Sequence, residues 1–319
     1  MNANWLDVLR DGAVWLPLED GLIAVTGDDS ETFLQGQLTN DVRRLAEGSR
    51  AQHSGMCSPK GRLLASFLLW RNDGMIYLWL PAEMQAAIQK RLSMYVLRSK
   101  VRLEDARPAW RLFGIAGQMA ADMLARLQLP VPELPLAVRS AAGVMVVRLQ
   151  EDRFLLAIAP QRQDTLEREL AEQATRIATE QWRWLDITAG IPVVLPATQE
   201  EFVPQMVNFD LTGGVDFHKG CYTGQEIVAR MQYLGRLKRR MYRVHAEVEL
   251  QSAQPIFSAD MADPTGMVVI AAPAPEGGWD ALVVAQIASA EHETLHVGSA
   301  DGAVLTLREL PYVVGEPVA

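Results

Sequence analysis

Short apolar runs alternate with amphipathic segments along much of the chain, and this alternation restricts the fold more than any other feature. A run over residues 21–27 is bounded by glycines, which is typical of a short buried strand, and Phe33 and Leu34 then follow in a predicted helix. Pro59 and Gly61 suit a hairpin turn between two further apolar runs. The continuing pattern predicts strands over 51–57, 62–70, 75–80 and 101–103 and a helix over 82–97. We therefore expect an α+β fold with helices packed on an antiparallel or mixed sheet.

The same order of strands and helices recurs later in the chain, although no residue-level repeat is visible. This second cycle predicts strands over 110–115, 144–149 and 153–159 and helices near 118–128 and 162–173. A short helix closed by Gly190 and stopped by Pro192 follows, and then a long polar loop to Asn208. The last short strands are predicted near 241–249, 267–271, 281–287 and 303–308. They indicate a small β-barrel or sandwich over residues 241–319.

Length and composition indicate a cytoplasmic protein of two or three domains. The chain has 319 residues, of which 49% are hydrophobic, and this is enough for sizeable cores. Its first residues, MNANWLDVLRDGAVW, contain acids and lack the apolar segment of a signal peptide or a membrane span. The two cysteines and five histidines have no metal-ligand spacing. We expect reduced thiols and no metal site built by this chain alone.

Charge is unevenly distributed along the chain. The net charge is −9, yet residues 42–111 contain thirteen Lys or Arg and five Asp or Glu, a net of +8. Residues 247–319 carry eleven acids and one base. Between Glu226 and Glu247 the sequence has no acid and six cations, namely Arg230, Arg236, Lys238, Arg239, Arg240 and Arg243. Such a region either attracts an anionic ligand, such as a carboxylated cofactor or an RNA backbone, or is a solvated helix face and strand edge.

The sequence HKGCYTGQE over residues 218–226 predicts the start of a helix. Thr223 and Glu226 have the spacing of a capping box, and Tyr222 and Ile227 occupy the hydrophobic-staple positions. The helix is expected to stop at Gly235. Its predicted apolar side consists of Ile227, Val228, Met231 and Leu234.

Cys221 is the candidate nucleophile of this segment. It is expected just outside the positive end of the helix dipole and lies two residues after Lys219. Both features favour a thiolate, because a helix N-terminus and a neighbouring cation each lower a thiol pKa. The structural alternative is that Cys221 is a small buried residue.

A second polar segment, QGQLTNDV over residues 35–42, ends the first predicted helix. Several of its side chains, Asn40 and Asp41 among them, are able to hydrogen-bond a heterocycle. Turn chemistry alone explains the Asn-Asp pair as well.

Three segments of the chain resemble the YgfZ family of folate-binding proteins. They are KGCYTGQE over residues 219–226, DITAGIP over 186–192 and FLQGQLTNDV over 33–42. The first of these is highly specific, and the similarity spans roughly residues 20–245. The acidic C-terminal segment matches only in character. YgfZ-like proteins are in turn similar to the glycine-cleavage aminomethyltransferase, the T-protein.

This resemblance implies a three-domain, aminomethyltransferase-like fold around a central tetrahydrofolate cavity. Residues 1–240 would form the folate-binding region, with two interleaved α+β domains that divide near residue 108, and residues 241–319 a C-terminal β-barrel. The resemblance also implies a role in making or maintaining iron–sulfur enzymes, including those that thiolate tRNA. The family's key cysteine falls on Cys221, and Lys219 is the second catalytic candidate. The candidate folate ligands are Asn40, Asp41, Trp184, Asp186, Gln205, Gln225 and Arg230.

One departure from the T-protein bears on whether the chain is an enzyme. The T-protein carries a catalytic aspartate pair on the strand after a Gly-containing turn, where this chain has Ala65 and Ser66. A transfer that loses such an acid–base group typically slows by roughly 10²–10⁴-fold. Thr188 also replaces a T-protein glutamate that contacts the pterin, and Asp186 is the candidate substitute.

Three functions therefore stay open. The leading hypothesis is a tetrahydrofolate-binding accessory protein of iron–sulfur enzyme maintenance whose Cys221 thiolate performs redox or transfer chemistry. The second is a folate-dependent one-carbon transferase. The third is a tRNA-binding module that uses Arg236, Lys238, Arg239 and Arg240.

Overall fold

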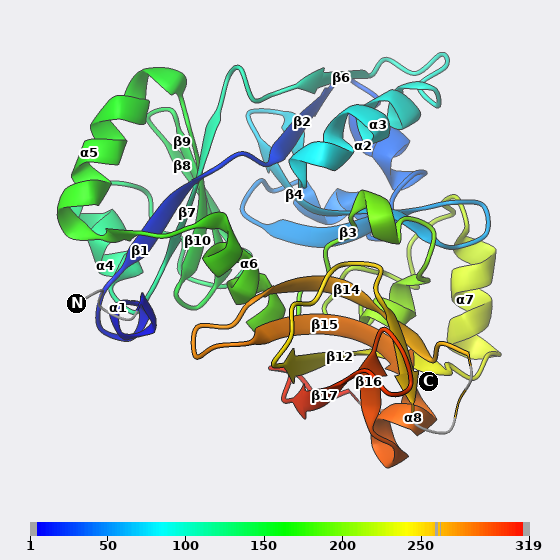
Figure 1. The fold of residues 1–319 in the computed structure, drawn as a ribbon. Helices are drawn as coiled ribbons and strands as arrows, with labels where there is room; N and C mark the ends of the chain where they lie inside the picture. Colours follow the sequence, from blue (N-terminus) through cyan, green and yellow to red (C-terminus); the bar gives the residue numbers. More distant parts are fainter. Residues whose placement is uncertain (1–4, 259–260, 262, 315–319) are drawn as a thin grey trace. The chain divides into compact units, whose positions relative to one another are not determined.

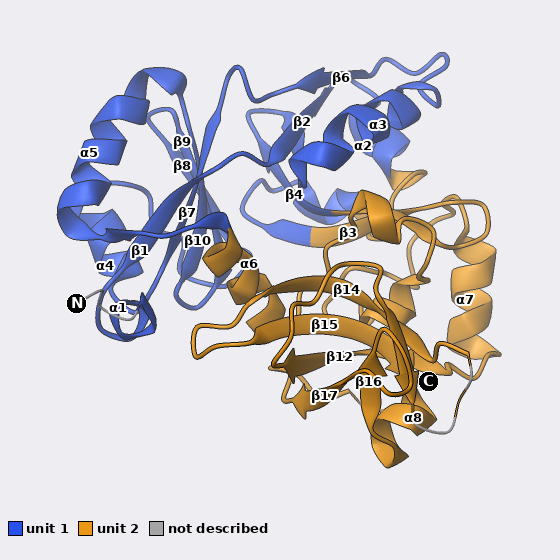
Figure 2. Cartoon of the chain, in the orientation of Figure 1, with its two compact units in different colours: residues 1–34, 42–52, 67–179 blue, residues 35–41, 53–66, 180–319 orange. Residues whose placement is uncertain are grey.

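The computed structural model describes residues 5–258, 261 and 263–314. The chain divides into two compact units (Figure 2). Unit 1 contains the residues up to 34, 42–52 and 67–179, and unit 2 contains residues 35–41, 53–66 and those from 180 onward. Each unit is therefore built from segments that lie far apart in the sequence.

A six-stranded sheet with flanking helices forms one part of unit 1 (Figure 1). Its elements are α1 (Trp5–Asp11), β1 (Val14–Leu18), β7 (Arg111–Ala116), α4 (Ala120–Arg126), β8 (Val138–Ala141), β9 (Val144–Gln150), β10 (Arg153–Ile158), the 3₁₀ helix η2 (Pro160–Arg162), α5 (Gln163–Gln173) and β11 (Thr175–Arg176). The strand order is β11-β1-β7-β10-β9-β8. Ile115 of β7 pairs with Phe154 of β10, and both belong to the core that Met123 of α4 and Leu166 of α5 complete. The two helices thus bury one face of this sheet.

A five-stranded sheet has residues in both units. Its elements are β2 (Gly21–Thr26), α2 (Ser30–Gln35), the 3₁₀ helix η1 (Val42–Leu45), β3 (Ala51–Cys57), β4 (Leu63–Asn72), β5 (Met75–Leu80), α3 (Ala82–Ser93) and β6 (Arg102–Asp105). The strand order is β3-β4-β5-β2-β6. Met84, Ile88 and Leu92 of α3 are buried, at the four-residue spacing that places them on one side of a helix.

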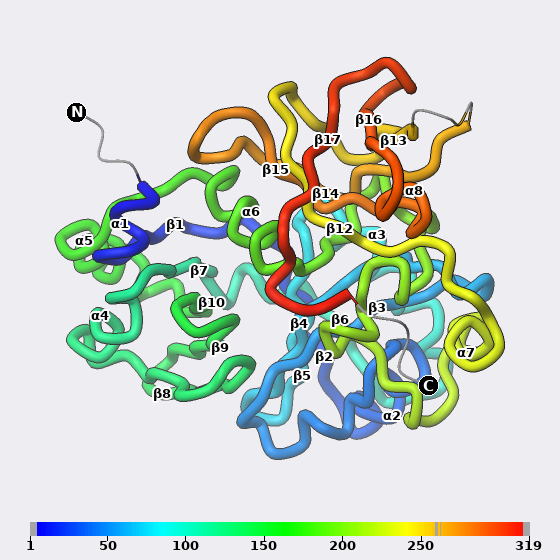
Figure 3. Tube along the Cα trace, turned by 90° about the horizontal axis from the view of Figure 1, so that it is seen from below, coloured from blue at the N-terminus to red at the C-terminus, as the bar shows by residue number. Residues whose placement is uncertain are grey.

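Unit 2 contains a closed barrel made of strands β12-β15-β14-β13-β16-β17. Its elements are α6 (Thr179–Thr188), the 3₁₀ helices η3 (Pro196–Thr198) and η4 (Pro204–Val207), α7 (Gln225–Tyr233), β12 (Arg239–Ala246), β13 (Pro255–Ser258), β14 (Gly266–Pro273), β15 (Trp279–Gln286), α8 (Ile287–His292), β16 (Leu295–Val297) and β17 (Ala303–Arg308). Val244, Ile256 and Val283 belong to the barrel core. After β17 the chain leaves the barrel (Figure 3), and the hydroxyl of Tyr312 donates a hydrogen bond to the carbonyl of Gly190 at 2.8 Å.

The predicted α+β architecture and the C-terminal barrel are confirmed. Strand β1 was not predicted, and it pairs with β7 although β2 follows it directly in the sequence. The sequence patterns also do not predict strands β8, β13 and β16 or helices α1 and α8. The helix predicted over 82–97 ends at Ser93, and Leu97 has a positive φ of 46°. Such a left-handed residue cannot continue a right-handed helix.

Candidate functional site

Two motifs that are far apart in the sequence meet inside unit 2. The hydroxyl of Thr39 donates to the carbonyl of Gly214 at 2.6 Å and accepts the N–H of Gly55 at 2.7 Å. The carbonyl of Thr39 accepts the N–H of Asp216 at 3.0 Å. The polar segment 35–41 is therefore a structural support for the loop that leads to Cys221.

Asn40 also supports the loop that leads to Cys221, through hydrogen bonds of its side chain. Its side-chain amide donates to the carbonyls of His53 at 2.8 Å and Gly213 at 2.7 Å, and its side-chain oxygen accepts the N–H of Asp41 at 2.8 Å. Asn40 is also buried. Both amide hydrogens are thus committed to the backbone, and the prediction that Asn40 contacts a folate is not supported by its position.

Lys219 belongs to the turn over residues 218–224 that leads into the next helix, and only 5% of its surface is exposed. Its ammonium donates to the carbonyl of Gln35 at 2.8 Å and to that of Leu38. It also lies 5.0 Å from the centre of the Tyr222 ring, within the range of a cation–π contact. These contacts join the 35–41 segment to the loop that carries Cys221.

Cys221 is exposed, as a reactive thiol requires. The residues on either side of it differ sharply in burial. Lys219 and Tyr222 are buried, with 5% and 8% of their surface exposed, whereas Gly220 is exposed and a side chain at its position would meet no atom within 4 Å. The turn is therefore held at both ends and presents the thiol outward.

The helix after this turn begins later than predicted. α7 starts at Gln225, and its N-cap is Gly224, which has a φ of 83° and provides no side-chain cap. The capping box of Thr223 and Glu226 is therefore wrong. The side chain of Gln225 instead accepts the N–H of Tyr222 at 3.3 Å, and a Cβ at Gly224 would lie 2.3 Å from the carbonyl oxygen of Ser58. Gly224 therefore packs closely against residues 58–61, and this close packing accounts for a glycine at the start of the helix.

The predicted apolar side of α7 is buried only in part. Val228 is fully buried, but Ile227 is 39% exposed and Leu234 is 85% exposed. The helical spacing identified a helix correctly, yet it did not reveal how much of each apolar side chain stays exposed.

Cys57 is the second cysteine of the chain. It is buried on β3, and burial raises its pKa to about 12. Burial also raises the pKa of Tyr222, and the nearby thiol of Cys57 adds to this rise. Burial lowers the pKa of His53 to about 4. All three groups are neutral at pH 7.

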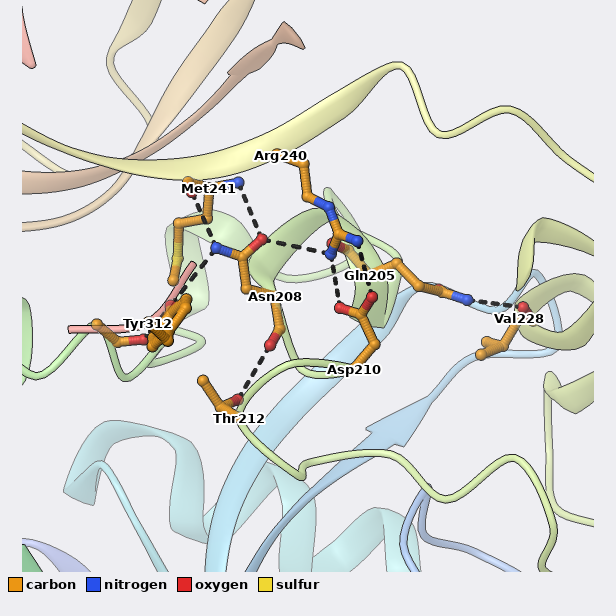
Figure 4. Close-up of polar contacts among 9 residues, drawn as sticks. Gln205, Asn208, Asp210, Thr212, Val228, Arg240, Met241 and Tyr312 are labelled. Atoms are coloured by element: carbon orange, nitrogen blue, oxygen red, sulfur yellow. Dashed lines mark hydrogen bonds and ion pairs between the residues drawn. The ribbon is translucent and has the colours of Figure 1, made fainter. Parts of the chain in front are cut away.

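A buried polar network contacts α7 at Val228 (Figure 4). Gln205 is 1% exposed, and its amide donates to the carbonyl of Val228 at 2.8 Å. Its backbone carbonyl accepts from Arg240 at 3.0 Å. The guanidinium of Arg240 makes two bonds to Asp210, of 2.6 and 2.8 Å. This pair was not predicted, because a single sequence does not show which distant Asp and Arg meet.

The prediction that Arg240 contacts tRNA is wrong. Its side chain is 2% exposed and paired with Asp210. It also lies 3.5 Å from the side-chain oxygen of Asn208, which has left-handed backbone geometry with a φ of 59°. Arg236 and Lys238 are exposed and Arg239 is half-buried, so the other three cations of this prediction stay accessible.

Trp184 contacts the barrel rather than an open surface. Its indole N–H donates to Asp280 at 2.8 Å, and Arg243 lies over its ring at 5.8 Å. Asp280 also accepts from Arg243 at 2.8 Å and is 2.9 Å from a ring nitrogen of His245. Burial of Asp280 opposes its ionisation, but these three hydrogen bonds outweigh burial and lower its pKa. Asp186 is half-buried on the same helix, α6.

The positions of the T-protein aspartate pair serve a structural purpose here. Ala65 is 1% exposed and Ser66 is 7% exposed. The hydroxyl of Ser66 accepts the N–H of Val194 at 3.0 Å, and so fastens the long polar loop to β4. The hydroxyl of Thr188 bonds its own helix, at the carbonyl of Leu185.

The residues of unit 2 fit a folate in part. All seven candidate ligands belong to this unit. Among the described residues, the side-chain oxygen of Gln205 is buried without a hydrogen-bond partner, and such an acceptor suits an N–H donor of a pterin. Arg230 is exposed on α7 and suits the carboxylates of a glutamate tail. Asn40 and the indole N–H of Trp184 are already used.

The described residues show neither a metal cluster nor a membrane-spanning helix. They contain no group of three or more His, Cys, Asp or Glu able to hold a metal ion. Within the same residues, no helix is both long and apolar enough to cross a membrane.

The fold matches that of a solved transferase. The glycine cleavage system aminomethyltransferase T from Bartonella henselae has a TM-score of 0.80 over 96% of this chain and 87% of that one, at 19% identity. This confirms the aminomethyltransferase-like fold predicted from the sequence, and at this identity the likeness concerns the fold alone.

Two relatives cover nearly the whole chain. The tRNA-modifying protein YgfZ of Sodalis glossinidius is 32% identical over 309 residues, which are 94% of this chain and 93% of the relative. The protein of the same name from Photorhabdus laumondii is 32% identical over 310 residues, with the same coverage. The chain therefore belongs to the YgfZ family. A comparison with models of protein families gave no match.

Proposed function

We propose that this chain is a tetrahydrofolate-binding accessory protein that acts in iron–sulfur enzyme maintenance and thereby in tRNA modification, in the cytoplasm. Cys221 is the key thiol of this proposal. Relatives that share nearly the full length of the chain are named tRNA-modifying proteins, and this supports the link to tRNA. Iron–sulfur enzymes that thiolate tRNA are the proposed clients.

The observation that carries the proposal is the exposed Cys221 between two buried anchors, Lys219 and Tyr222. A thiolate is both a nucleophile and a metal ligand, so an accessible cysteine in a fixed turn suits the repair or transfer of an iron–sulfur group. The turn holds the sulfur in one place, which lowers the entropic cost of meeting a reacting partner.

Lys219 has a positioning role in this proposal rather than an acid–base role. Its ammonium bonds the carbonyls of Gln35 and Leu38, and these contacts fix the base of the turn. A lysine whose ammonium donates to two backbone carbonyls has little freedom to carry a proton to a substrate.

When bound, tetrahydrofolate would supply a carrier of one-carbon units. Gln205 would accept a hydrogen bond from the pterin through its buried side-chain oxygen, and Arg230 would pair with the glutamate tail. Asp41, Asp186 and Gln225 complete the proposed set, and Trp184 is left out because its indole N–H donates to Asp280. We leave out Asn40, because its amide is bonded to two backbone carbonyls.

Replacement of the thiol tests the proposal. In a strain that lacks the gene, Cys221→Ser should abolish the rescue of thiolated tRNA nucleosides, measured by mass spectrometry, while the affinity for tetrahydrofolate in calorimetry stays the same. The matched control is Cys57→Ala, which removes the buried thiol and should restore thiolation. Full rescue by Cys221→Ser would refute a thiol mechanism.

A folate-dependent transferase is the second candidate, because the chain shares its fold with an aminomethyltransferase. Against it, Ala65 and Ser66 offer no carboxylate, and the hydroxyl of Ser66 is bonded to the backbone of Val194. Turnover of methylene-tetrahydrofolate with an aminomethyl donor decides between the two. Turnover at rates of ordinary enzymes, about 1–10³ per second, would favour the transferase.

A further inference from the structure

Four cations follow Cys221 in the sequence, on α7 and on the residues that lead into β12. Figure 1 shows the path of the backbone from α7 to β12. Arg230, Arg236 and Lys238 are exposed and Arg239 is half-buried. Within the described part of the chain, none of these four side chains makes a hydrogen bond or an ion pair. No acid occurs from residue 227 to residue 246. We call residues 230–239 the α7 surface.

Several exposed cations elsewhere in the protein are compensated. Arg107 lies 2.6 Å from Asp105, and Arg139 lies 2.7 Å from Glu133. The four cations of the α7 surface differ from these two in having no ion pair among the described residues. An uncompensated group of cations attracts phosphates, and this attraction weakens as salt rises.

An exposed aromatic residue lies between these cations in the sequence. Tyr233, the last residue of α7, is 57% exposed. The centre of its ring lies 6.3 Å from that of Phe217, and the two ring planes make an angle of 73°, an edge-to-face contact that favours one ring orientation while much of the residue stays exposed. Leu234 beside it is 85% exposed. A fixed, open aromatic ring is a platform on which an unpaired base can stack.

We propose that the α7 surface binds a single-stranded segment of RNA. Tyr233 stacks on an unpaired base, and Arg230, Arg236, Lys238 and Arg239 contact the flanking phosphates. An acidic protein is the less suitable occupant, because the centres of protein interfaces are depleted of charged residues, whereas here Tyr233 lies in a segment whose charged residues are all cations. The inference rests on the proposed role in tRNA modification for its biological setting.

Binding is tested with the full-length protein and a fluorescein-labelled RNA of about 12 nucleotides, a length within the range of single-strand binding sites. Fluorescence anisotropy should show tighter binding to the single strand than to a duplex of the same length. The logarithm of the binding constant should fall with the logarithm of salt at a slope of about −2 to −3, as three or four phosphate contacts predict. Equal affinity for single strand and duplex would overturn the stacking model.

Two variants separate stacking from charge. Tyr233→Ala should weaken binding by about 5- to 150-fold, the range expected for loss of one stacked base, while Tyr233→Phe keeps the ring and the affinity. The double change Arg236→Gln and Lys238→Gln should reduce the salt slope by about 1. Its charge-matched control, Arg107→Gln with Arg139→Gln, removes two compensated cations and should change the affinity less than about twofold. Equal losses in both double variants would overturn the inference.

The RNA measurement is independent of Cys221. Cys221→Ser protein should bind the RNA as the unchanged protein does. If no RNA binds while thiolation in cells still depends on Cys221, this inference is wrong and the proposed function stands. If the RNA binds and Cys221→Ser restores thiolation, the thiol mechanism is wrong and the RNA surface stands.

Discussion

Two neighbouring regions of unit 2 contain the same kinds of residue in opposite settings. The supporting layer, made of Cys57, Asp210 and Arg240, is buried, and its arginine is paired with its acid. The presenting region, made of Cys221 and the α7 surface, is exposed, and its cations lack acid partners among the described residues. Residue type therefore does not decide the role of a cysteine or an arginine here. Burial and pairing decide it.

The largest expected difference is between the two thiols. Cys57 has its pKa raised to about 12 by burial, from an ordinary value of 9.0, so at a given pH its thiolate is roughly 10³-fold rarer than that of an ordinary cysteine. In native protein, iodoacetamide should modify Cys221 and leave Cys57 unmodified until denaturant is added. Peptide mass spectrometry measures both sites.

The same shift has a consequence for stability. A raised folded-state pKa means that the folded protein holds the Cys57 proton more tightly than the unfolded chain does. The resulting stabilisation is fully present below about pH 9 and is lost as the pH rises toward 12. Cys57→Ala should reduce this alkaline loss. Fast alkylation of Cys57 in native protein would contradict its assignment to the supporting layer.

The second difference concerns the arginines. Arg240→Met leaves the carboxylate of Asp210 buried without its cation and should lower the free energy of unfolding by about 3–5 kcal/mol. Urea denaturation followed by tryptophan fluorescence measures this loss. Adding Asp210→Leu to Arg240→Met should restore part of it, since an apolar pair of similar volume avoids the buried charge. A double variant as unstable as the sum of its single variants would show that the pair is not coupled.

The third difference lies within the turn itself. Gly224→Ala places a Cβ 2.3 Å from the carbonyl oxygen of Ser58, at a φ of 83°, and should cost about 1–3 kcal/mol. The control is Gly220→Ala, which meets no atom within 4 Å and should change the free energy of unfolding by less than about 0.5 kcal/mol. Similar losses at both positions would mean that the turn is not held where the structure places it.

Much of the fold could be predicted from the sequence, because the core strands carry continuous apolar runs. The strands over 51–57 and 75–80 were predicted with their observed bounds. Strand β1 was missed because its partners β7 and β11 come about a hundred or more residues later, and no local signal reports such a pairing. Specific strings, such as KGCYTGQE over residues 219–226, also indicate the family to which the chain belongs.

The site was less accessible to prediction. The exposed Cys221 and its turn follow from the motif, but the roles of Asn40 and Arg240 do not. Asn40 hydrogen-bonds Gly213 across 173 positions, and Arg240 meets Asp210 across 30. A polar side chain looks equally able to bind a ligand or a distant backbone carbonyl until its tertiary partner is known.

The smallest expected change in the free energy of unfolding concerns Arg236, a cation of the α7 surface. Arg236 is exposed and makes no side-chain ion pair among the described residues, so Arg236→Gln should change the free energy of unfolding by less than about 0.5 kcal/mol. Arg240→Met, only four positions away in the sequence, should cost several times more. The same denaturation experiment measures both. A large loss on Arg236→Gln would mean that this cation stabilises the fold, and it would then be a poor candidate for binding a phosphate.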